Sequence, residues 1–195
     1  NCYVVTPDNN SEICYIIDLP PDVEPALEYV INNNLSIGGC FLTHGHFDHS
    51  LGMEKVDGEI YINLEDEFLA RNPQEQLSAF TNSELEVQEY TGELNDIFTY
   101  KNENIIIYSN PGHTKGSVSY EFKNLGVVFT GDFVFAEGIG RTDLYSGSTS
   151  EMKESINNIF LTFNKDLEVF PGHGNTDTVK NILNYNSYLK EFING

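Results

Sequence analysis

A dense group of potential metal ligands occupies residues 43–49, which read Thr-His-Gly-His-Phe-Asp-His. This H-x-H-x-D-H pattern contains His44, His46, Asp48 and His49 and directly follows a short apolar run. On the loop that ends a strand, the first two histidines can converge on one ion while the last two ligands turn towards a second. Imidazole and carboxylate suit zinc, iron or manganese, so the ligand types alone do not choose the metal. A loop of ordinary surface histidines is the alternative, and the number of matching positions disfavours it.

The other two of the five histidines also follow apolar runs. His113 stands in Pro-Gly-His-Thr and His173 in Pro-Gly-His-Gly, and another run leads into Gly-Asp at Asp132. The apolar runs before these three motifs are rich in β-branched or aromatic residues, so each predicts a buried strand; they span residues 105–108, 127–130 and 167–170. Loops at one edge of such a sheet can meet at a site. One metal centre then accounts for every histidine in the chain.

The ordered set H-x-H-x-D-H, P-G-H-T, G-D and P-G-H-G resembles the metallo-β-lactamase superfamily over nearly the whole chain. The resemblance implies an α/β fold, a four-layer αββα sandwich, with a two-metal site at one edge of the paired sheets. The implied ligands are His44, His46 and His113 for one metal, Asp48, His49 and His173 for the other, and Asp132 as the bridge. Two divalent ions are therefore expected, with zinc favoured over iron or manganese.

Within the superfamily, the pattern is most similar to small hydrolases of the glyoxalase II kind. His46-x-Asp48 differs from the H-x-E-x-D of flavodiiron oxygen reductases, and Asp132 stands where zinc β-lactamases commonly use a cysteine. Residues 140–144, Gly-Arg-Thr-Asp-Leu, are like a segment of short glyoxalase II-like enzymes and of persulfide dioxygenases. The resemblance thus implies a metal-dependent hydrolase that acts on small-molecule thioesters.

Asp48 and Asp132 are the expected catalytic carboxylates. Metal lowers the pKa of bound water to about 7, which makes a metal-bridging hydroxide available at neutral pH. Asp48 is expected to orient this nucleophile, and Asp132 to offset the repulsion between the two ions. A thiolate leaving group needs little acid assistance, because a thiol has a pKa of about 8.5. A thioester therefore suits a site without an obvious general acid.

Lys115 and Arg141 adjoin the motifs in sequence and are the expected cationic contacts for a substrate carboxylate. Ordinary salt bridges are an equal alternative, and Arg141 can pair with Asp143. Full-length glyoxalase II carries a helical C-terminal segment that supplies much of its glutathione site. This sequence stops at Gly195 soon after the last motif, so we expect weak glutathione binding.

Three other functions compete with thioester hydrolysis. A persulfide dioxygenase with one iron is the nearest alternative, supported by residues 140–143, whereas His173 and the full second-metal set favour hydrolysis. A phosphodiesterase or nuclease of the same fold is disfavoured by the negative charge. A metal-buffering or scaffold protein is the non-enzyme alternative. Scaffolds of this fold typically lose ligands, and none of the seven expected ligands is missing here.

Length and composition limit the possibilities further. A chain of 195 residues fits a single domain over residues 1–195, or two closely packed halves. The formal charge of −20, from 10 basic and 30 acidic residues, leaves no basic stripe for nucleic acid. No apolar run approaches the roughly 20 residues that cross a bilayer. The three cysteines follow no C-x-x-C spacing and predict reduced thiols in the cytoplasm.

The remaining pattern predicts strands followed by a helix, twice, which favours a two-half α/β sandwich. A hairpin over residues 2–17 ends at Asp18, which is expected either to fix the tautomer of a ligand histidine or to form a turn. Further helices are expected over residues 22–33, 64–70, 149–163 (with Ser148 and Glu151 at capping-box spacing) and 177–192. Residues 72–99 predict an irregular connection, either a surface insertion or a lid with Phe80 and Tyr90 as substrate contacts.

Overall fold

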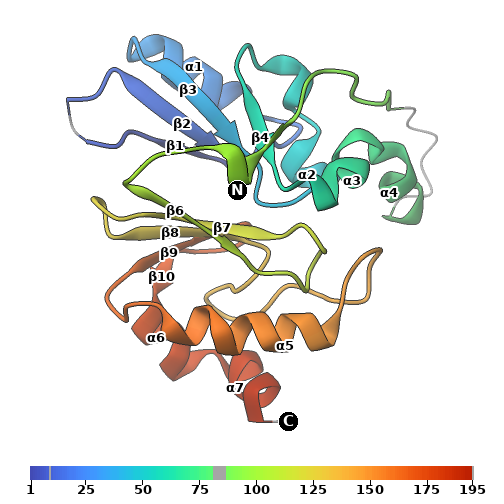
Figure 1. Ribbon diagram of the computed structural model, residues 1–195, viewed down its shortest axis with the longest axis vertical. Coiled ribbons are helices and arrows are strands. Elements are labelled where there is room, and N and C mark those ends of the chain that lie inside the picture. Colours follow the sequence, from blue (N-terminus) through green and yellow to red (C-terminus); the bar gives the residue numbers. More distant parts are fainter. Residues whose placement is uncertain (9, 81–86, 195) are drawn as a thin grey trace. The chain divides into compact units, whose positions relative to one another are not determined.

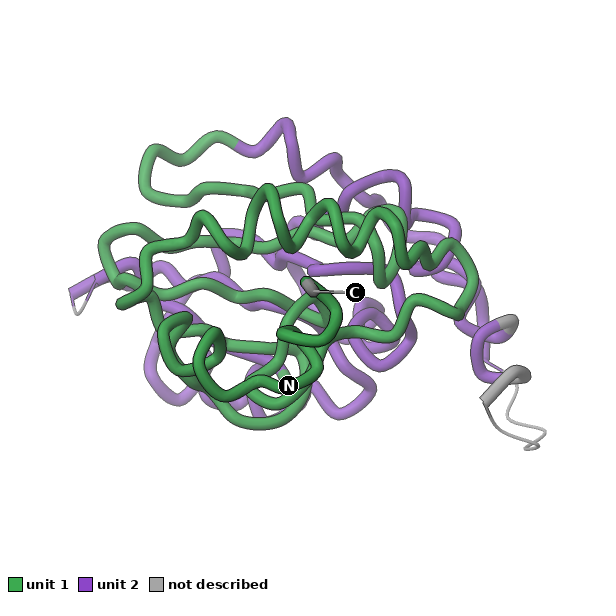
Figure 2. Tube along the Cα trace, turned by 90° about the horizontal axis from the view of Figure 1, so that it is seen from below, with its two compact units in different colours: residues 1, 101–195 green, residues 2–100 purple. Residues whose placement is uncertain are grey.

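The computed structural model describes residues 1–8, 10–80 and 87–194 (Figure 1). The chain divides into two compact units (Figure 2): an N-terminal unit, Cys2–Tyr100, and a C-terminal unit, Lys101–Gly195 together with Asn1. Each unit folds around its own five-stranded sheet. This agrees with the expectation of two halves, and a single domain over residues 1–195 stays a prediction.

The sheet of the N-terminal unit has the order β1-β2-β3-β4-β5. Its strands are β1 (Tyr3–Val5), β2 (Ile13–Ile17), β3 (Ser36–Phe41), β4 (Ile60–Ile62) and β5 (Asn95–Asp96). The predicted hairpin is confirmed, because β1 pairs antiparallel with β2, and the other neighbouring strands pair in parallel. The helices are α1 (Glu24–Asn32), α2 (Phe47–Ser50), α3 (Glu67–Arg71) and α4 (Pro73–Phe80).

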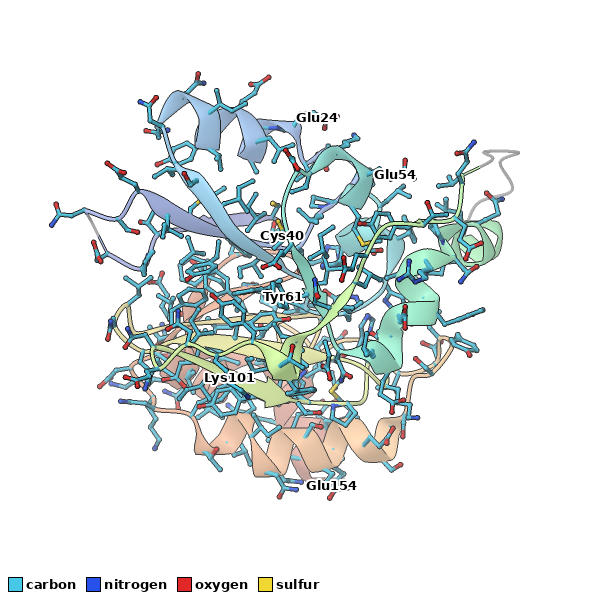
Figure 3. All side chains as sticks on the ribbon, turned by 45° about the horizontal axis from the view of Figure 1, so that its top comes forward. Glu24, Cys40, Glu54, Tyr61, Lys101 and Glu154 are labelled. Atoms are coloured by element: carbon cyan, nitrogen blue, oxygen red, sulfur yellow. The ribbon has the colours of Figure 1, made fainter. Side chains whose placement is uncertain are left out.

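Side chains alternate between the two faces of this sheet, as the period of a strand requires. One face carries a buried apolar cluster that includes Cys14, Ile16 and Cys40, and Val30 of α1 packs into this cluster. Figure 3 labels Cys40. The other face carries stacked aromatic rings, with ring centroids 5.2 Å apart for Tyr15 and Phe41. Burial of these apolar groups is what fixes β3, the strand that leads into the histidine loop.

The sheet of the C-terminal unit has the order β10-β9-β8-β7-β6. Its strands are β6 (Ile105–Ser109), β7 (Val118–Phe122), β8 (Val127–Gly131), β9 (Glu168–Pro171) and β10 (Asp177–Thr178). The helices are α5 (Thr149–Asn158), α6 (Val179–Tyr185) and α7 (Ser187–Asn194). Helix α5 buries Met152 and Ile156 in a core with Val128 and Val169 of the sheet. Ser148 caps α5 as predicted, because its hydroxyl accepts a 3.3 Å hydrogen bond from the backbone N–H of Glu151.

Two predicted helices need correction. The helix expected over residues 149–163 stops at Asn158 and continues as a short 3-10 turn, Phe160–Thr162. The helix expected over residues 177–192 is divided, because Asp177–Thr178 forms β10 and the chain becomes extended at Asn186, where ψ is 103°. The Asn186 side chain accepts a 2.9 Å hydrogen bond from the N–H of Leu189, which restarts the helix as α7.

Strand direction explains where the motifs of the C-terminal unit lie. Strands β6 and β8 both pair antiparallel with β7, so they run in the same direction, and β9 pairs in parallel with β8. The carboxyl ends of these three strands therefore share one edge of the sheet, and the loops that follow them carry His113, Asp132 and His173. In the N-terminal unit, the parallel strands β2 and β3 bring Asp18 and Thr43 to one edge in the same way.

No helix in the described ranges is both long and apolar enough to serve as a membrane-spanning segment.

Candidate metal centre

The histidine loop of the N-terminal unit begins where β3 ends and runs into α2. A side chain could not replace Gly45, because a Cβ there would lie 2.6 Å from the carbonyl oxygen of Asp66 and 2.9 Å from the N–H nitrogen of Ala70. The Gly45 N–H instead donates a 2.9 Å hydrogen bond to Oδ2 of Asp66, which is fully buried. The glycine between the two histidines therefore lets the loop pack directly against α3 and the residue before it.

All four ligand candidates of this loop converge. The ligand atoms of His44 and His46 lie within 4.8 Å of each other, and the same limit holds for Asp48 and His49. Oδ2 of Asp48 is 3.6 Å from Nε2 of His49, and the rings of His44 and His49 have centroids 4.2 Å apart. The loop thus gathers three imidazoles and one carboxylate, as the spacing of the motif predicts.

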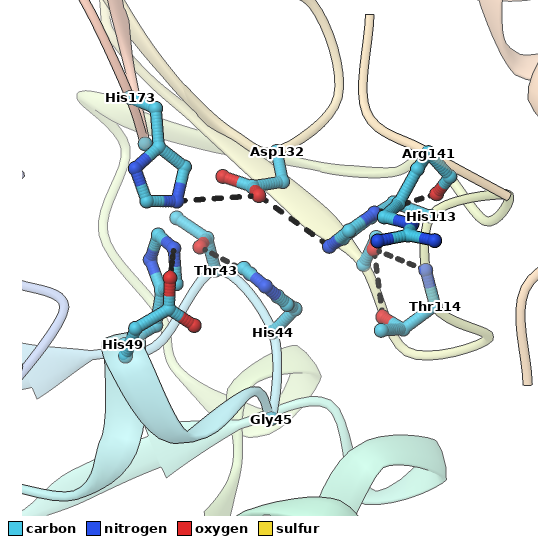
Figure 4. Close-up of polar contacts among 12 residues, drawn as sticks. Thr43, His44, Gly45, His49, His113, Thr114, Asp132, Arg141 and His173 are labelled. Carbon is cyan, nitrogen blue, oxygen red and sulfur yellow. Dashed lines mark hydrogen bonds and ion pairs between the residues drawn. The ribbon is translucent and has the colours of Figure 1, made fainter. Parts of the chain in front are cut away.

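Asp18 and Thr43 fix the tautomers of two of these histidines. Nδ1 of His49 donates a 2.8 Å hydrogen bond to Oδ2 of Asp18. The Thr43 hydroxyl donates to the same carboxylate at 2.9 Å and lies 3.0 Å from Nδ1 of His44 (Figure 4). Because that hydroxyl has one proton and uses it on Asp18, it accepts from the Nδ1–H of His44. Nε2 is therefore the expected ligand atom of both histidines, and the hydrogen bond of Asp18 to His49 agrees with the tautomer-fixing role, which stays a prediction.

In the C-terminal unit, one carboxylate oxygen lies between two histidines. Oδ2 of Asp132 is 3.5 Å from Nε2 of His113 and 3.5 Å from Nε2 of His173 (Figure 4). Nδ1 of His113 donates a 2.7 Å hydrogen bond to the carbonyl oxygen of Arg141, which again leaves Nε2 as the ligand atom. A carboxylate oxygen with an imidazole nitrogen on either side is the arrangement expected of a bridging ligand.

The donor set fits divalent transition metals. Imidazole Nε2 atoms and carboxylate oxygens suit zinc and iron, and carbonyl, hydroxyl or carboxylate partners on Nδ1 are what metal-binding histidines require. The seven predicted ligands are divided between the two units. The N-terminal unit supplies His44, His46, Asp48 and His49, and the C-terminal unit supplies His113, Asp132 and His173.

Sequence reasoning missed Gln76, which lies on α4 in the stretch expected to be irregular. Its Oε1 accepts a 3.0 Å hydrogen bond from the N–H of Phe47, and its Nε2 donates to the carbonyl oxygens of Gly45 at 3.2 Å and Leu69 at 2.7 Å. Gln76 thus holds the backbone on both sides of His46. No sequence motif indicates that Gln76 binds the backbone of the histidine loop, because a single polar residue on a short helix has no distinctive spacing.

The predicted substrate contacts have other partners or lie at the surface. Arg141 forms a two-bond ion pair with Asp143 at 2.7 and 2.8 Å, which is the alternative that the sequence left open. The Arg141 guanidinium lowers the pKa of the Asp143 carboxyl to about 2. Lys115 is exposed, and its N–H donates to the Ser146 hydroxyl at 3.3 Å. Contact of Lys115 or Arg141 with a substrate stays a prediction.

Of the two candidate lid residues, only Tyr90 has a described side chain. The guanidinium carbon of Arg71 lies 5.8 Å from the ring centroid of Tyr90, and Nη1 of Arg71 donates a 3.0 Å hydrogen bond to the Tyr90 carbonyl oxygen. Tyr90 therefore packs against α3. The side chain of Phe80 lies outside the described residues.

A cavity of about 340 Å³ adjoins His173 in the C-terminal unit. Its walls are residues 135–138, from the turn after Asp132, and residues 173–175, from the loop after β9. The rings of Phe135 and His173 meet edge to face, with centroids 6.1 Å apart. Space for part of a substrate therefore exists directly beside one of the predicted ligands.

Comparison with known proteins gives a consistent result. The sequence profile described as "Metallo-beta-lactamase superfamily" matches residues 1–173. "Probable metallo-hydrolase YqgX" of Bacillus subtilis is 30% identical over 98% of this chain and 93% of its own length. "Hydroxyacylglutathione hydrolase GloC" of Haemophilus influenzae is 29% identical over 97% of this chain and 92% of its own. The crystal structure of the BLEG-1 B3 metallo-β-lactamase, 26% identical, superposes with a TM-score of 0.82 over 100% of this chain and 94% of that one.

Proposed function

This chain belongs to the metallo-β-lactamase superfamily and is a metallo-hydrolase with an α/β sandwich fold, and from that premise we propose that it hydrolyses thioesters of small molecules with two metal ions. The observation that carries the proposal is the position of Asp132, whose Oδ2 lies 3.5 Å from the Nε2 atoms of both His113 and His173. A carboxylate in that position is needed when two ions must be held next to each other.

The proposed ligand sets follow the superfamily pattern. His44, His46 and His113 would hold one ion, and Asp48, His49 and His173 would hold the other. Asp132 would contribute to both sites, and zinc is favoured over iron or manganese. Hydrogen bonds in the N-terminal unit support this assignment. Asp18 contacts Nδ1 of His49 and Thr43 contacts Nδ1 of His44, which leaves Nε2 of both rings as the ligand atom.

When bound, the two metals supply Lewis acidity and lower the pKa of coordinated water to about 7. Side chains of the protein would then set the geometry of the reacting groups. Asp48 would accept a hydrogen bond from the attacking water and orient it, and the Asp132 carboxylate would offset the positive charge of the two ions. The Nδ1–H groups of His44, His49 and His113 donate to the Thr43 hydroxyl, the Asp18 carboxylate and the Arg141 carbonyl oxygen, which leaves Nε2 of each ring as the ligand atom. The departing thiolate needs no proton from a side chain, because a thiol has a pKa of about 8.5.

Two features support a thioester over the other substrates of this fold. The relative called hydroxyacylglutathione hydrolase aligns over nearly all of this chain. A net charge of −20 opposes the binding of a phosphodiester or nucleic acid. The ligand set also disfavours a mononuclear dioxygenase, because only a second metal requires Asp48, His49 and His173 as ligands.

The three free cysteines fit a reducing compartment, and we place the protein in the cytoplasm.

Metal analysis joined to a thioester assay tests this function. Protein purified without chelator, or reconstituted with zinc, manganese or iron, is expected to hold two ions per chain and to release thiol from S-lactoylglutathione and from simple acyl thioesters. Chelator should remove both properties, and metal should restore them. At most one ion per chain after every reconstitution, or no thiol release at two ions per chain, would refute the proposal.

A further inference from the structure

Hydrogen bonds hold one wall of the cavity beside His173 in place. One wall is a tight turn in which the Phe135 N–H donates a 2.9 Å hydrogen bond to the Gly138 carbonyl oxygen. The side chain of Asn186, which is 1% exposed, donates to the carbonyl oxygens of Phe135 at 3.1 Å and of Gly138 at 2.9 Å. The same asparagine that divides the C-terminal helix therefore fixes this turn, with Glu137 at its tip.

The groups that line the cavity have a definite chemical character. The lining residues include Glu137 with a carboxylate, Asn175 with a neutral amide, Phe135 with an aromatic ring, and His173. No lysine or arginine is among the described residues that line it. A carboxylate with an aromatic ring nearby is a combination that attracts ammonium groups, since the ring face carries partial negative charge. A substrate carboxylate would meet repulsion from Glu137 and from the overall charge of −20.

We propose that this cavity is a subsite for a positively charged end group of the thioester substrate, such as a protonated or quaternary amine, with Glu137 as the residue that selects it. The inference rests on the proposed function, because the acyl carbon must reach the metals that His173 helps to hold. A metal ion held by His173 would add positive charge at that residue, so we expect the ammonium group to bind beside Glu137. Glutathione thioesters match this subsite less well than a simple amine, because their one ammonium group stands beside a carboxylate and their net charge is negative.

Three thioesters that differ mainly in end-group charge test the selection. S-acetylthiocholine is cationic, 3,3-dimethylbutyl thioacetate is its neutral isostere, and S-acetyl-3-mercaptopropionate is anionic. The metal-loaded wild type should show kcat/KM about two- to fivefold higher for the cation than for the isostere, as one exposed charge pair allows. The anion should be the poorest, and added salt should reduce the preference. Equal kcat/KM for all three, or preference for the anion, would overturn the subsite.

The matched variants are Glu137→Gln and Glu154→Gln. Both remove one negative charge from the C-terminal unit, but Glu154 is exposed on α5 and does not line the cavity (Figure 3). Glu137→Gln should bring the cation-to-isostere ratio to about one while the neutral ester keeps its rate. Glu154→Gln should leave the ratio unchanged. A ratio that both variants lower equally would show a general charge effect and refute the role of Glu137.

Binding without turnover separates this inference from the proposed function. Choline chloride, titrated into isotope-labelled protein in zinc buffer, should shift the amide resonances of residues 135–138 and 175, and 3,3-dimethylbutanol should shift them less. Choline binding without any thioester hydrolysis would refute the function and retain a cation subsite. Thioester hydrolysis without choline shifts at these residues would retain the function and refute the subsite.

Discussion

Nδ1 of His49 donates a 2.8 Å hydrogen bond to Oδ2 of Asp18, a residue 31 positions earlier in the chain. Asp18 is 2% exposed and has a positive φ of 62°, a conformation that a non-glycine residue adopts only when its surroundings hold it there. Its carboxylate also accepts from the N–H and the hydroxyl of Thr43. One buried side chain therefore orients His49 directly and His44 through Thr43.

Asp18→Asn should weaken metal binding. An amide can donate to Nδ1 of His49 and so favour the tautomer that carries its proton on Nε2, the ligand atom. Loss of such a partner typically costs 10–100-fold in metal affinity, and we expect a decrease of that size in zinc competition with a chelating dye. Asp22→Asn, an exposed neighbour, is the control for charge. Equal zinc affinity in Asp18→Asn and the wild type would show that Asp18 does not set the tautomer.

Gln76→Leu should disturb the histidine loop more than the core. The variant removes three hydrogen bonds around His46, which should lower the free energy of unfolding by about 1–3 kcal/mol. The visible spectrum of the cobalt-substituted protein should change, since the geometry of His46 depends on the backbone that Gln76 holds. Gln74→Leu on the same helix loses only a 2.8 Å hydrogen bond from the Val87 N–H and serves as the control. A wild-type cobalt spectrum in Gln76→Leu would contradict a positioning role.

The Cys40 thiol provides a test of stability against pH. Burial raises its pKa to about 12, with smaller contributions from Cys2 and Cys14. An unfolded thiol ionises near pH 8.5, so the stabilisation is fully present below that pH and is lost as the pH rises towards 12. In Cys40→Ala, the decline in the free energy of unfolding above pH 9 should be shallower by up to about 1.4 kcal/mol per pH unit. Urea unfolding at several pH values measures it.

Thioester hydrolysis by Cys40→Ala should stay close to wild type, because Cys40 packs in the core of the N-terminal unit. Parallel curves of stability against pH for the two proteins would show that the thiol ionises normally in the folded state. A large loss of activity with unchanged metal content would indicate that the thiol takes part in the reaction.

The sequence was most informative where a motif directly follows an apolar strand. His44, Asp132 and His173 could be placed at strand ends because each apolar run is short and its loop begins with a motif. The direction of those strands, and so the edge that they share, depends on pairing between distant segments. That pairing could be taken only from the resemblance to a family.

Gln76 and Asn186 show what the sequence could not provide. Gln76 lies on α4 and Asn186 lies between α6 and α7, and neither has a sequence pattern that separates it from a solvated polar residue. Their roles arise from backbone carbonyl groups far away in the chain, at Gly45 for Gln76 and at Phe135 and Gly138 for Asn186. The amphipathic pattern over residues 177–192 predicted one helix, because the apolar residues keep a helical spacing across Asn186. The helical conformation of the backbone is nevertheless interrupted there.

The central claim, hydrolysis with two metals, is tested most directly by thioester hydrolysis and persulfide-dependent oxygen uptake, measured together on the wild type and His173→Ala. His173 is 51% exposed, so its removal should spare the fold. Loss of the second ion should decrease thioester hydrolysis by at least about a hundredfold, because metal ligation contributes several kcal/mol to transition-state stabilisation. We predict that loss, together with negligible oxygen uptake by both proteins. Oxygen uptake with glutathione persulfide in the wild type that survives in His173→Ala would contradict the hydrolase and indicate a mononuclear iron dioxygenase.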